Sequence, residues 1–174
     1  LADAFDTGTS TVLWVSVAFW VTSFGLLPSL GWMGDVHGRQ RVFTLGSLVF
    51  AVALLGAAAA PNVWLLIAAR VLQGVGSSMV LSNLNAVIAS TFPREERGMA
   101  MGISGAVVGV GLTAGPLAGG LLIDALDWRA LFYTRIPLGL LGAALAWWVL
   151  PSDRTTGGRF RLDLIGSATM FGTL

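Results

Sequence analysis

Residues 99–123 read MAMGISGAVVGVGLTAGPLAGGLLI, a stretch of 25 amino acids without a charge. As an α-helix it would extend over about 37 Å, enough to cross the roughly 30 Å hydrocarbon core of a bilayer. Four more stretches have the same character and together contain only two charged residues, Arg70 and Arg135. They are residues 12–30, 42–60, 63–90 and 131–150. The sequence therefore predicts an all-α, polytopic membrane protein with five complete crossings.

The composition agrees with a membrane protein and argues against several functions. Only 11% of the 174 residues are charged, against about 25% in a typical soluble domain. Ten basic and nine acidic residues are dispersed along the chain, so nothing indicates nucleic-acid binding. There is no cysteine and one histidine, so we expect no disulfide, no metal site and no cofactor. No nucleophile–base pair is visible either, and we expect no enzyme activity.

The loops between the predicted crossings are short, so neighbouring helices must run antiparallel. Seven arginines then lie on one side of the membrane, in residues 31–41, 91–98 and 151–163. The positive-inside rule places this side, with the loop at 151–163, in the cytoplasm. Residues 164–174 predict the start of a further membrane helix that is cut short, so we expect a fragment of a larger protein. All ten basic residues are arginine, a bias that suggests a GC-rich bacterial coding sequence.

The first polar motif is the connection between the first two crossings, residues 31–41, which reads GWMGDVHGRQR. Its glycines, among them Gly31 and Gly38, permit a tight turn. Asp35 and Arg39 bring opposite charges to the membrane surface, where their pairing can hold one arrangement of helices and release another. Taken alone, a short charged turn more often only marks one side of the membrane and contains an ion pair exposed to water.

The second motif lies inside the third crossing, where Arg70 is followed by Gln73 and Gly74. Arg70 stands seven residues past Val63, about 10 Å below the outer surface at helical rise. Because an arginine in hydrocarbon is costly, it faces protein or a water-filled cavity unless its side chain extends to the headgroups. Arg70, Gln73 and Ser77 share one helix face. This polar face favours an Arg70 side chain that points towards protein or a water-filled cavity.

The third motif is the stretch quoted first. Gly111, Gly115 and Gly119 recur every four residues and form a groove that another helix can approach closely. Pro116 removes a backbone hydrogen bond and bends or loosens the helix. Glycines at this spacing alone indicate ordinary helix packing. The longer pattern, with a Gly-Pro step and a paired glycine, is more specific.

Together the three motifs resemble the major facilitator superfamily, and within it the 14-span drug:proton antiporters. The connection motif is carried by Gly31, Asp35, Gly38, Arg39 and Arg41. The motif of the third crossing is carried by Leu66, Arg70, Gln73, Gly74 and Gly76. The fourth crossing carries, at every fixed position, the motif associated with exporters, in Gly102, Gly111, Gly115, Pro116, Gly119 and Gly120. The short connection at residues 151–163 favours the 14-span group over 12-span relatives.

The resemblance implies that the five crossings are the second to the sixth of the family's N-terminal six-helix bundle. It also implies proton-coupled export of hydrophobic or cationic compounds, such as drugs, across the cytoplasmic membrane by alternating access. In that scheme the connection motif is a conformational latch, with Glu95 or Glu96 as further partners. Arg70 and its neighbours take part in proton coupling, and the glycine motif packs two helical bundles together. The expected partners are the lipid bilayer, a small substrate, protons and the remaining transporter helices.

Some positions depart from the family pattern. Met33 replaces a leucine, Val36 and Gln40 replace basic residues, and Arg135 stands where relatives commonly have asparagine. Arg135 either pairs with Asp124 or Asp127 or selects the substrate.

Two other functions stay open. A symporter or facilitator for a metabolite would use the same fold, although the complete glycine motif argues against it. A non-transporting membrane scaffold would pack through the glycine groove, although Arg70 and Gln73 inside the membrane argue against it. None of the predicted crossings contains Asp or Glu, so the carboxylate that carries the proton must lie outside this chain.

Overall fold

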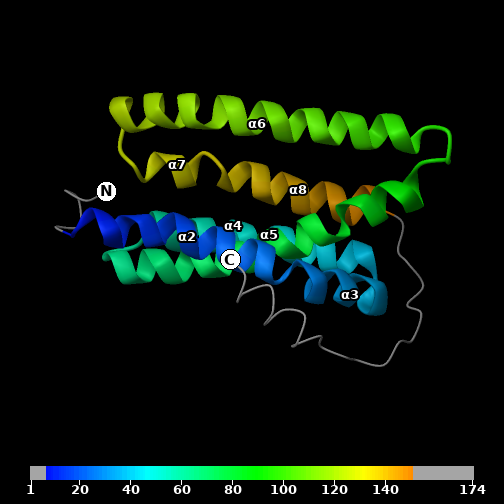
Figure 1. Cartoon of the computed structure of the whole chain (residues 1–174), viewed down its shortest axis with the longest axis horizontal. Coiled ribbons are helices and arrows are strands. Elements are labelled where there is room, and N and C mark those ends of the chain that lie inside the picture. The colour runs from blue at the N-terminus through cyan, green and yellow to red at the C-terminus, as the bar shows by residue number, and fades with distance from the viewer. Residues whose placement is uncertain (1–6, 151–174) are drawn as a thin grey trace.

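The computed structural model describes residues 7–150, apart from the side chains of Thr9 and Asp124. The predicted connection at 151–163 and the predicted helix start at 164–174 lie outside the described residues. Within them, all regular structure is helical, which confirms the predicted all-α fold class (Figure 1). The helices are α2 (Thr9–Gly25), α3 (Leu27–His37), α4 (Arg39–Ala58), α5 (Val63–Thr91), α6 (Arg97–Ala125), α7 (Ala130–Tyr133) and α8 (Ile136–Val149).

Four segments are long and apolar enough to cross a membrane, and five if the bent pair α2–α3 counts as one span. The other four are α4, α5, α6 and the segment Ala130–Val149, which consists of α7 and α8. Helix α5 ends one residue beyond the predicted 63–90, and α6 extends two residues beyond 99–123 at each end. These lengths and compositions are those of a polytopic membrane protein.

The first connection differs from the sequence expectation. Residues 31–41 were expected to form a loop, but the chain stays helical up to His37 and α4 begins at Arg39. Leu26 marks a 49° bend between α2 and α3, and Pro28 stands in the first turn of α3, where its missing N–H is not needed. Gly38 alone makes the turn, with a φ of 93° that only glycine adopts readily.

The last predicted crossing, residues 131–150, is interrupted. Helix α7 ends at Tyr133 and α8 begins at Ile136. Pro137 explains the break, because proline lacks an amide hydrogen and its ring clashes with the carbonyl four residues earlier. Thr134 and Arg135 between the two helices keep right-handed helical dihedral angles, so the direction of the span continues.

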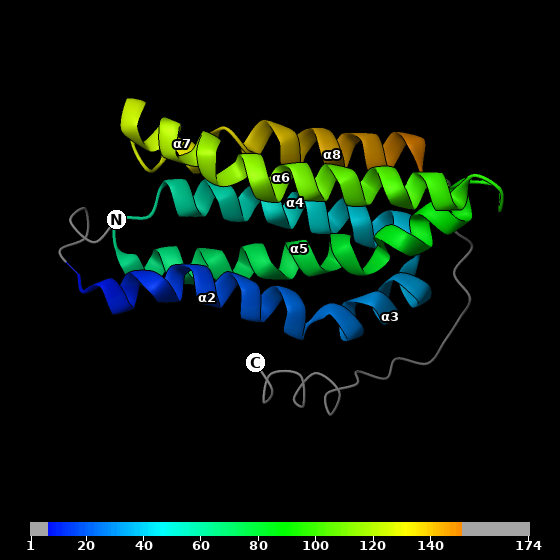
Figure 2. The same cartoon turned by 45° about the horizontal axis from the view of Figure 1, so that its top comes forward.

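The helices form layers around α4 and α5. Helix α5 packs between α2 and α4, and α4 packs between α5 and α8 (Figure 2). The hydrophobic core joins Leu54 of α4, Leu66 of α5 and Phe132 of α7. Between α4 and α5 the backbones touch, since a Cβ added to Gly76 would lie 2.7 Å from the carbonyl oxygen of Gly46. Glycine at both positions is what allows this close packing.

Helix α6 stands apart from these layers. It lies along one edge of the bundle (Figure 1) and packs only lightly on α5 and α7. Its apolar residues are largely exposed, as are Val107 at 66% and Leu117 at 71%. An apolar helix exposed in this way fits lipid or further helices, and it leaves a space between itself and α2.

Candidate functional site

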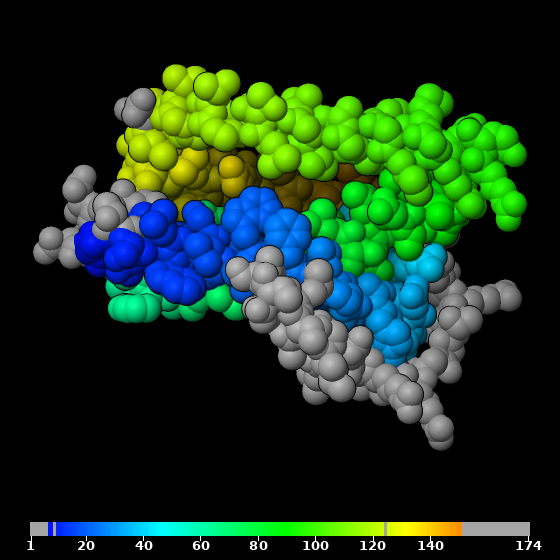
Figure 3. All heavy atoms as spheres, in the orientation of Figure 1, coloured from blue at the N-terminus to red at the C-terminus, as the bar shows by residue number. Residues whose placement is uncertain are grey.

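The space between α6 and the rest of the bundle is a cavity of about 670 Å³. Figure 3 shows the hollow between α6 and α2. Helix α2 contributes Phe19 and Trp20, and α5 contributes Arg70. The glycine face of α6 forms the opposite wall with Gly111, Gly115, Pro116, Gly119 and Gly120. The structure thus brings two of the three sequence motifs to one site.

Arg70 is the charged residue of α5 in this cavity. Its guanidinium carbon lies 5.8 Å from the ring centre of Phe19 and 5.0 Å from that of Phe132. One terminal nitrogen donates a 3.0 Å hydrogen bond to the amide oxygen of Gln73. The Nε atom is buried and has no hydrogen-bond partner among the described residues. Aromatic rings and an amide therefore surround this charge. This arrangement favours an Arg70 side chain that faces protein and the cavity over one that extends to the headgroups.

The other residues of the same motif serve packing. Gln73 is 1% exposed and holds Arg70 in place. A Cβ on Gly74 would lie 2.7 Å from the Cβ of Thr22, so this glycine lets α5 approach α2. Gly76 lies against α4. A role of these glycines in proton coupling stays a prediction.

Ser77 does not share the site of Arg70, although the helix pattern placed both on one face. It lines a separate cavity of about 310 Å³, with Phe50 of α4 and Gly142 of α8. Seven helical residues separate the two side chains, about 10 Å along the axis. At that separation in depth they contact different neighbouring helices.

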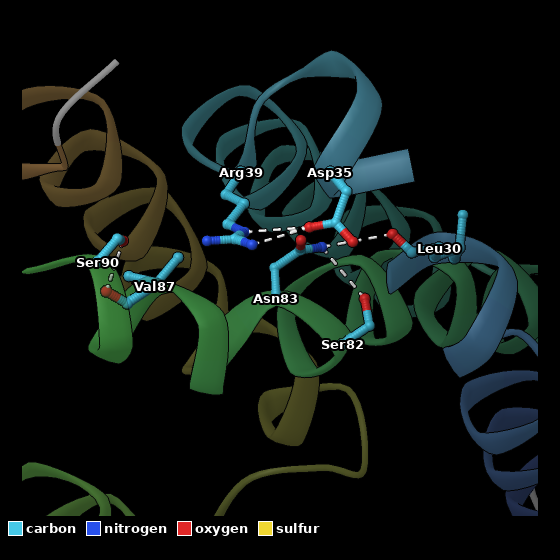
Figure 4. A network of polar contacts seen from close by, with 7 residues as sticks. All are labelled: Leu30, Asp35, Arg39, Ser82, Asn83, Val87 and Ser90. Carbon is cyan, nitrogen blue, oxygen red and sulfur yellow. Dashed lines mark hydrogen bonds and ion pairs between the residues drawn. The ribbon is translucent and has the colours of Figure 1, made fainter. Parts of the chain in front are cut away.

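The connection motif forms a local ion pair. A terminal nitrogen of Arg39 lies 2.9 Å from an Asp35 carboxylate oxygen, and both side chains are partly exposed (Figure 4). The pair joins the end of α3 to the start of α4 across Gly38. Glu95 and Glu96 take part in no ion pair within residues 7–150. A latch between larger bodies stays a prediction.

The remaining residues of this motif face elsewhere. A Cβ on Gly31 would lie 3.5 Å from the Cβ of Ser82, so Gly31 packs α3 on α5. Arg41 lines a third cavity, of about 640 Å³, with Trp147 and Trp148 of α8. The five motif residues therefore do not form one cluster in this structure.

Two buried polar residues of α5 were missed by the sequence analysis. Ser78 is fully buried and its hydroxyl donates to the carbonyl oxygen of Ser23, at 2.5 Å. Asn83 is 1% exposed, and its amide nitrogen donates to the carbonyl oxygens of Met79, at 2.9 Å, and Leu30, at 3.4 Å (Figure 4). Both side chains bind the backbone of the bent pair α2–α3 to α5. The sequence signal that could have identified them is a polar residue within an otherwise apolar membrane crossing.

The glycine motif of α6 meets few described neighbours. A Cβ added to Gly102, Gly111, Gly115 or Gly120 would have nothing within 4 Å in the described part of the chain. At Gly119 it would lie 3.4 Å from Leu131. The helix also continues through Pro116 without a break. The predicted close contact with another helical bundle therefore stays a prediction.

Arg135 lines the same cavity as Arg70. Of its two expected partners, Asp127 pairs instead with Arg129, at 3.4 Å, and Arg129 also lies over the Trp128 ring, at 4.4 Å. The side chain of Asp124 lies outside the described residues. Arg135 forms no ion pair or side-chain hydrogen bond with the side chains that the structure describes.

Membrane-crossing helices that line a cavity with charged side chains are found in membrane transport proteins. The family model described as Major Facilitator Superfamily matches residues 1–163, and the chain belongs to this family. Membership confirms the resemblance at the level of the superfamily and places the chain among transporters rather than enzymes.

Several relatives are similar along most of the chain. The puromycin resistance protein pur8 of Streptomyces alboniger is 43% identical over 92% of the chain. The riboflavin transporter RibZ of Clostridioides difficile is 32% identical over 87%, and the multidrug transporter MdtP of Bacillus subtilis is 31% identical over 94%. The chain spans 32%, 33% and 30% of the length of these three relatives.

Proposed function

We propose that the whole protein is a proton-coupled efflux antiporter of the 14-span drug:proton group, which exports hydrophobic compounds across the cytoplasmic membrane of a bacterium. The observation that carries this proposal is the cavity in which Arg70 faces the glycine motif of α6. Similarity to a puromycin resistance protein and to a multidrug transporter supports it. The resemblance to the antiporter group also includes cationic compounds as substrates.

The proposed cycle assigns different tasks to the two walls of the cavity. Arg70 is permanently charged and cannot carry the proton itself. It acts on a proton-carrying carboxylate supplied by the rest of the protein, through its fixed charge beside the cavity. The small residues of α6 let a second helical bundle approach and separate as the cavity opens to either side.

The proposal is tested with the full-length protein in inverted membrane vesicles that have an acidic lumen. Puromycin is added outside, and a fluorescent probe follows the pH of the lumen. An antiporter releases lumenal protons when it imports the compound, so the lumenal pH rises. Vesicles without the protein are the control. Uptake of puromycin with no change in lumenal pH would contradict proton-coupled antiport.

A metabolite transporter is the second candidate, because the riboflavin transporter RibZ matches 87% of the chain. The same vesicles distinguish the two functions when riboflavin replaces puromycin. Movement of riboflavin but not of puromycin favours this second candidate.

Gly115→Leu is expected to lower efflux by about 5- to 150-fold while the protein still reaches the membrane. The leucine side chain fills the cavity next to Arg70 and holds a second bundle away from α6. Overpacking of this kind costs about 1–3 kcal/mol, which corresponds to about 5- to 150-fold in rate. The measurement is the initial rate of proton release in the vesicle assay.

Gly105→Leu is the matched control for this substitution. Gly105 lies on the same helix, a Cβ there also meets nothing within 4 Å among the described residues, and it does not line the cavity. We expect it to retain wild-type efflux. Equal rates for Gly115→Leu and the wild type would show that the glycine face is not a moving contact.

A further inference from the structure

The end of α3 that carries the connection motif rests on α5 through two glycines. A Cβ added to Gly31 would lie 3.5 Å from the Cβ of Ser82, an ordinary contact. A Cβ added to Gly34, which is buried, would instead overlap the amide group of Asn83 and lie 2.6 Å from its Cγ. The amide of Asn83 therefore occupies the space that any side chain at position 34 would need.

Hydrogen bonds hold the Asn83 amide in this place (Figure 4). Its nitrogen donates to the carbonyl oxygens of Met79, at 2.9 Å, and Leu30, at 3.4 Å, and to the hydroxyl oxygen of Ser82, at 3.2 Å. Asn83 is also 1% exposed, so its amide cannot exchange these partners for water. Turning the amide away from Gly34 would break hydrogen bonds to both helices. The two residues are therefore matched, and a change at either one alone destabilises the contact.

Gly34 connects this contact to the ion pair of the motif. Its carbonyl oxygen accepts a 3.0 Å hydrogen bond from the backbone nitrogen of Gly38, the residue that makes the turn. The next residue after Gly34 is Asp35, whose carboxylate pairs with Arg39 on the far side of that turn. Fixing the backbone of Gly34 on α5 therefore fixes the turn and the ion pair as well.

The ion pair cannot hold this end of α3 by itself. The Asp35 side chain is 59% and the Arg39 side chain 33% exposed, and exposed ion pairs contribute little to stability because water screens them. The amide of Asn83, in contrast, contacts α3 away from water, where a polar group that loses its partners is destabilising. The placement of Asp35 therefore depends on Asn83.

We propose that Asn83 is a positioning residue of the transport cycle, which holds the end of α3 and its ion pair on α5 through the space at Gly34. The inference rests on the proposed efflux function, for which the antiporter resemblance makes this ion pair a conformational latch. Asn83 does not line the cavity of Arg70 and acts through α3. Its removal is expected to lower the maximal transport rate and to leave the half-saturating substrate concentration within about twofold of the wild type.

The first test cross-links α3 to α5 in the full-length protein, with any other cysteine replaced by serine. Gly31→Cys and Ser82→Cys together place two thiols on Cβ atoms 3.5 Å apart, a separation that suits a disulfide. The rate of oxidation is followed by the loss of thiols that react with a maleimide mass tag. Adding Gly34→Ala is expected to slow oxidation by at least about fivefold, because the alanine pushes α3 away from the amide.

Further addition of Asn83→Ala is expected to restore the original rate of oxidation, because the smaller side chain leaves room for alanine at position 34. If Gly34→Ala alone does not accumulate in the membrane, recovery of the protein on adding Asn83→Ala is the equivalent result. Equal oxidation rates with and without Gly34→Ala, or no recovery on adding Asn83→Ala, would overturn the proposal.

Transport gives the second readout, with the native residues at positions 31 and 82. The rate is the uptake of puromycin or riboflavin by the vesicles, divided by the amount of folded protein. Gly34→Ala and Asn83→Ala are each expected to lower the maximal rate at least about twofold. The variant with both substitutions is expected to come within about twofold of the wild type. Asn85→Ala is the matched control, an exposed asparagine of the same helix, and should behave as the wild type.

A merely structural role of Asn83 would lower the amount of folded protein and leave the rate per folded protein unchanged, which overturns the proposal. A loss of affinity at an unchanged maximal rate also overturns it, because it would place Asn83 in contact with the substrate. Cross-linking needs neither a substrate nor a proton gradient. Absence of proton-coupled efflux would therefore contradict the proposed function and leave the cross-linking result standing, so the two failures are distinguishable.

Discussion

In the full-length protein, Gly76→Val is expected to remove most of the correctly folded material from the membrane. A Cβ at this position would lie 2.6 Å from the backbone nitrogen of Phe50 and 2.7 Å from the carbonyl oxygen of Gly46. Both are backbone atoms, which cannot move aside as a flexible side chain can. The two helices must separate, and the cost reaches about 3 kcal/mol, the upper part of the usual range for overpacking.

The measurement is the yield of monodisperse protein after solubilisation, together with its midpoint of thermal unfolding. Gly56→Ala is the control on the same pair of helices, because its Cβ would lie 3.7 Å from the Cβ of Ala69, an ordinary contact. We expect a neutral to slightly stabilising effect there, since alanine favours a helix over glycine by about 1 kcal/mol. Normal yield and stability of Gly76→Val would show that α4 and α5 do not pack as described.

The fold class could be predicted because the bilayer imposes it. Long uncharged stretches must form helices, since hydrocarbon offers no other partner for backbone amides and carbonyls. The limits of α5 and α6 followed from hydropathy to within two residues. Hydropathy failed at Gly31–His37, where polar residues suggested a loop. Helix α3 continues there because its backbone hydrogen bonds do not depend on apolar side chains, and it ends only where Gly38 adopts positive φ.

The candidate site was predictable in its parts but not in its assembly. The sequence pattern singled out Arg70 and the glycine motif of α6 separately, and only the packing of α2, α5 and α6 shows that they line one cavity. Contacts between distant residues leave no periodic signal. The bond from Ser78 to Ser23 spans 55 residues, and nothing in the local pattern of either helix indicates it.

The surroundings of Arg135 could not be predicted from the sequence either. The sequence left two alternatives for Arg135, an ion pair with Asp124 or Asp127 or a role in substrate selection, because only nearby partners can be recognised in a sequence. In the structure Asp127 pairs with Arg129, the side chain of Asp124 lies outside the described residues, and Arg135 lines the cavity. Its surroundings, and hence the charge of the site, depend on how the end of α7 meets α5.

Arg70→Ala is expected to abolish substrate-induced proton release in the vesicle assay, with a rate at least about tenfold below that of the wild type. A tenfold effect lies within the usual range of coupling free energies between two sites. The guanidinium is the fixed charge that α5 presents to the cavity, and no other residue of the described helices can replace it there except Arg135, which comes from another element. Without it, the proposed proton-carrying carboxylate loses the charge that links its ionisation to the occupancy of the cavity.

This substitution also removes packing, because Arg70 lies between the rings of Phe19 and Phe132. Arg70→Lys separates the two effects: it keeps the positive charge but cannot reproduce the planar contact with rings and amide. We expect partial proton release from the lysine variant and wild-type amounts of both variants in the membrane. Arg94→Ala, at an exposed arginine outside the cavity, should behave as the wild type. Undiminished proton release by Arg70→Ala would exclude Arg70 from the coupling and leave it as a packing residue of the cavity wall.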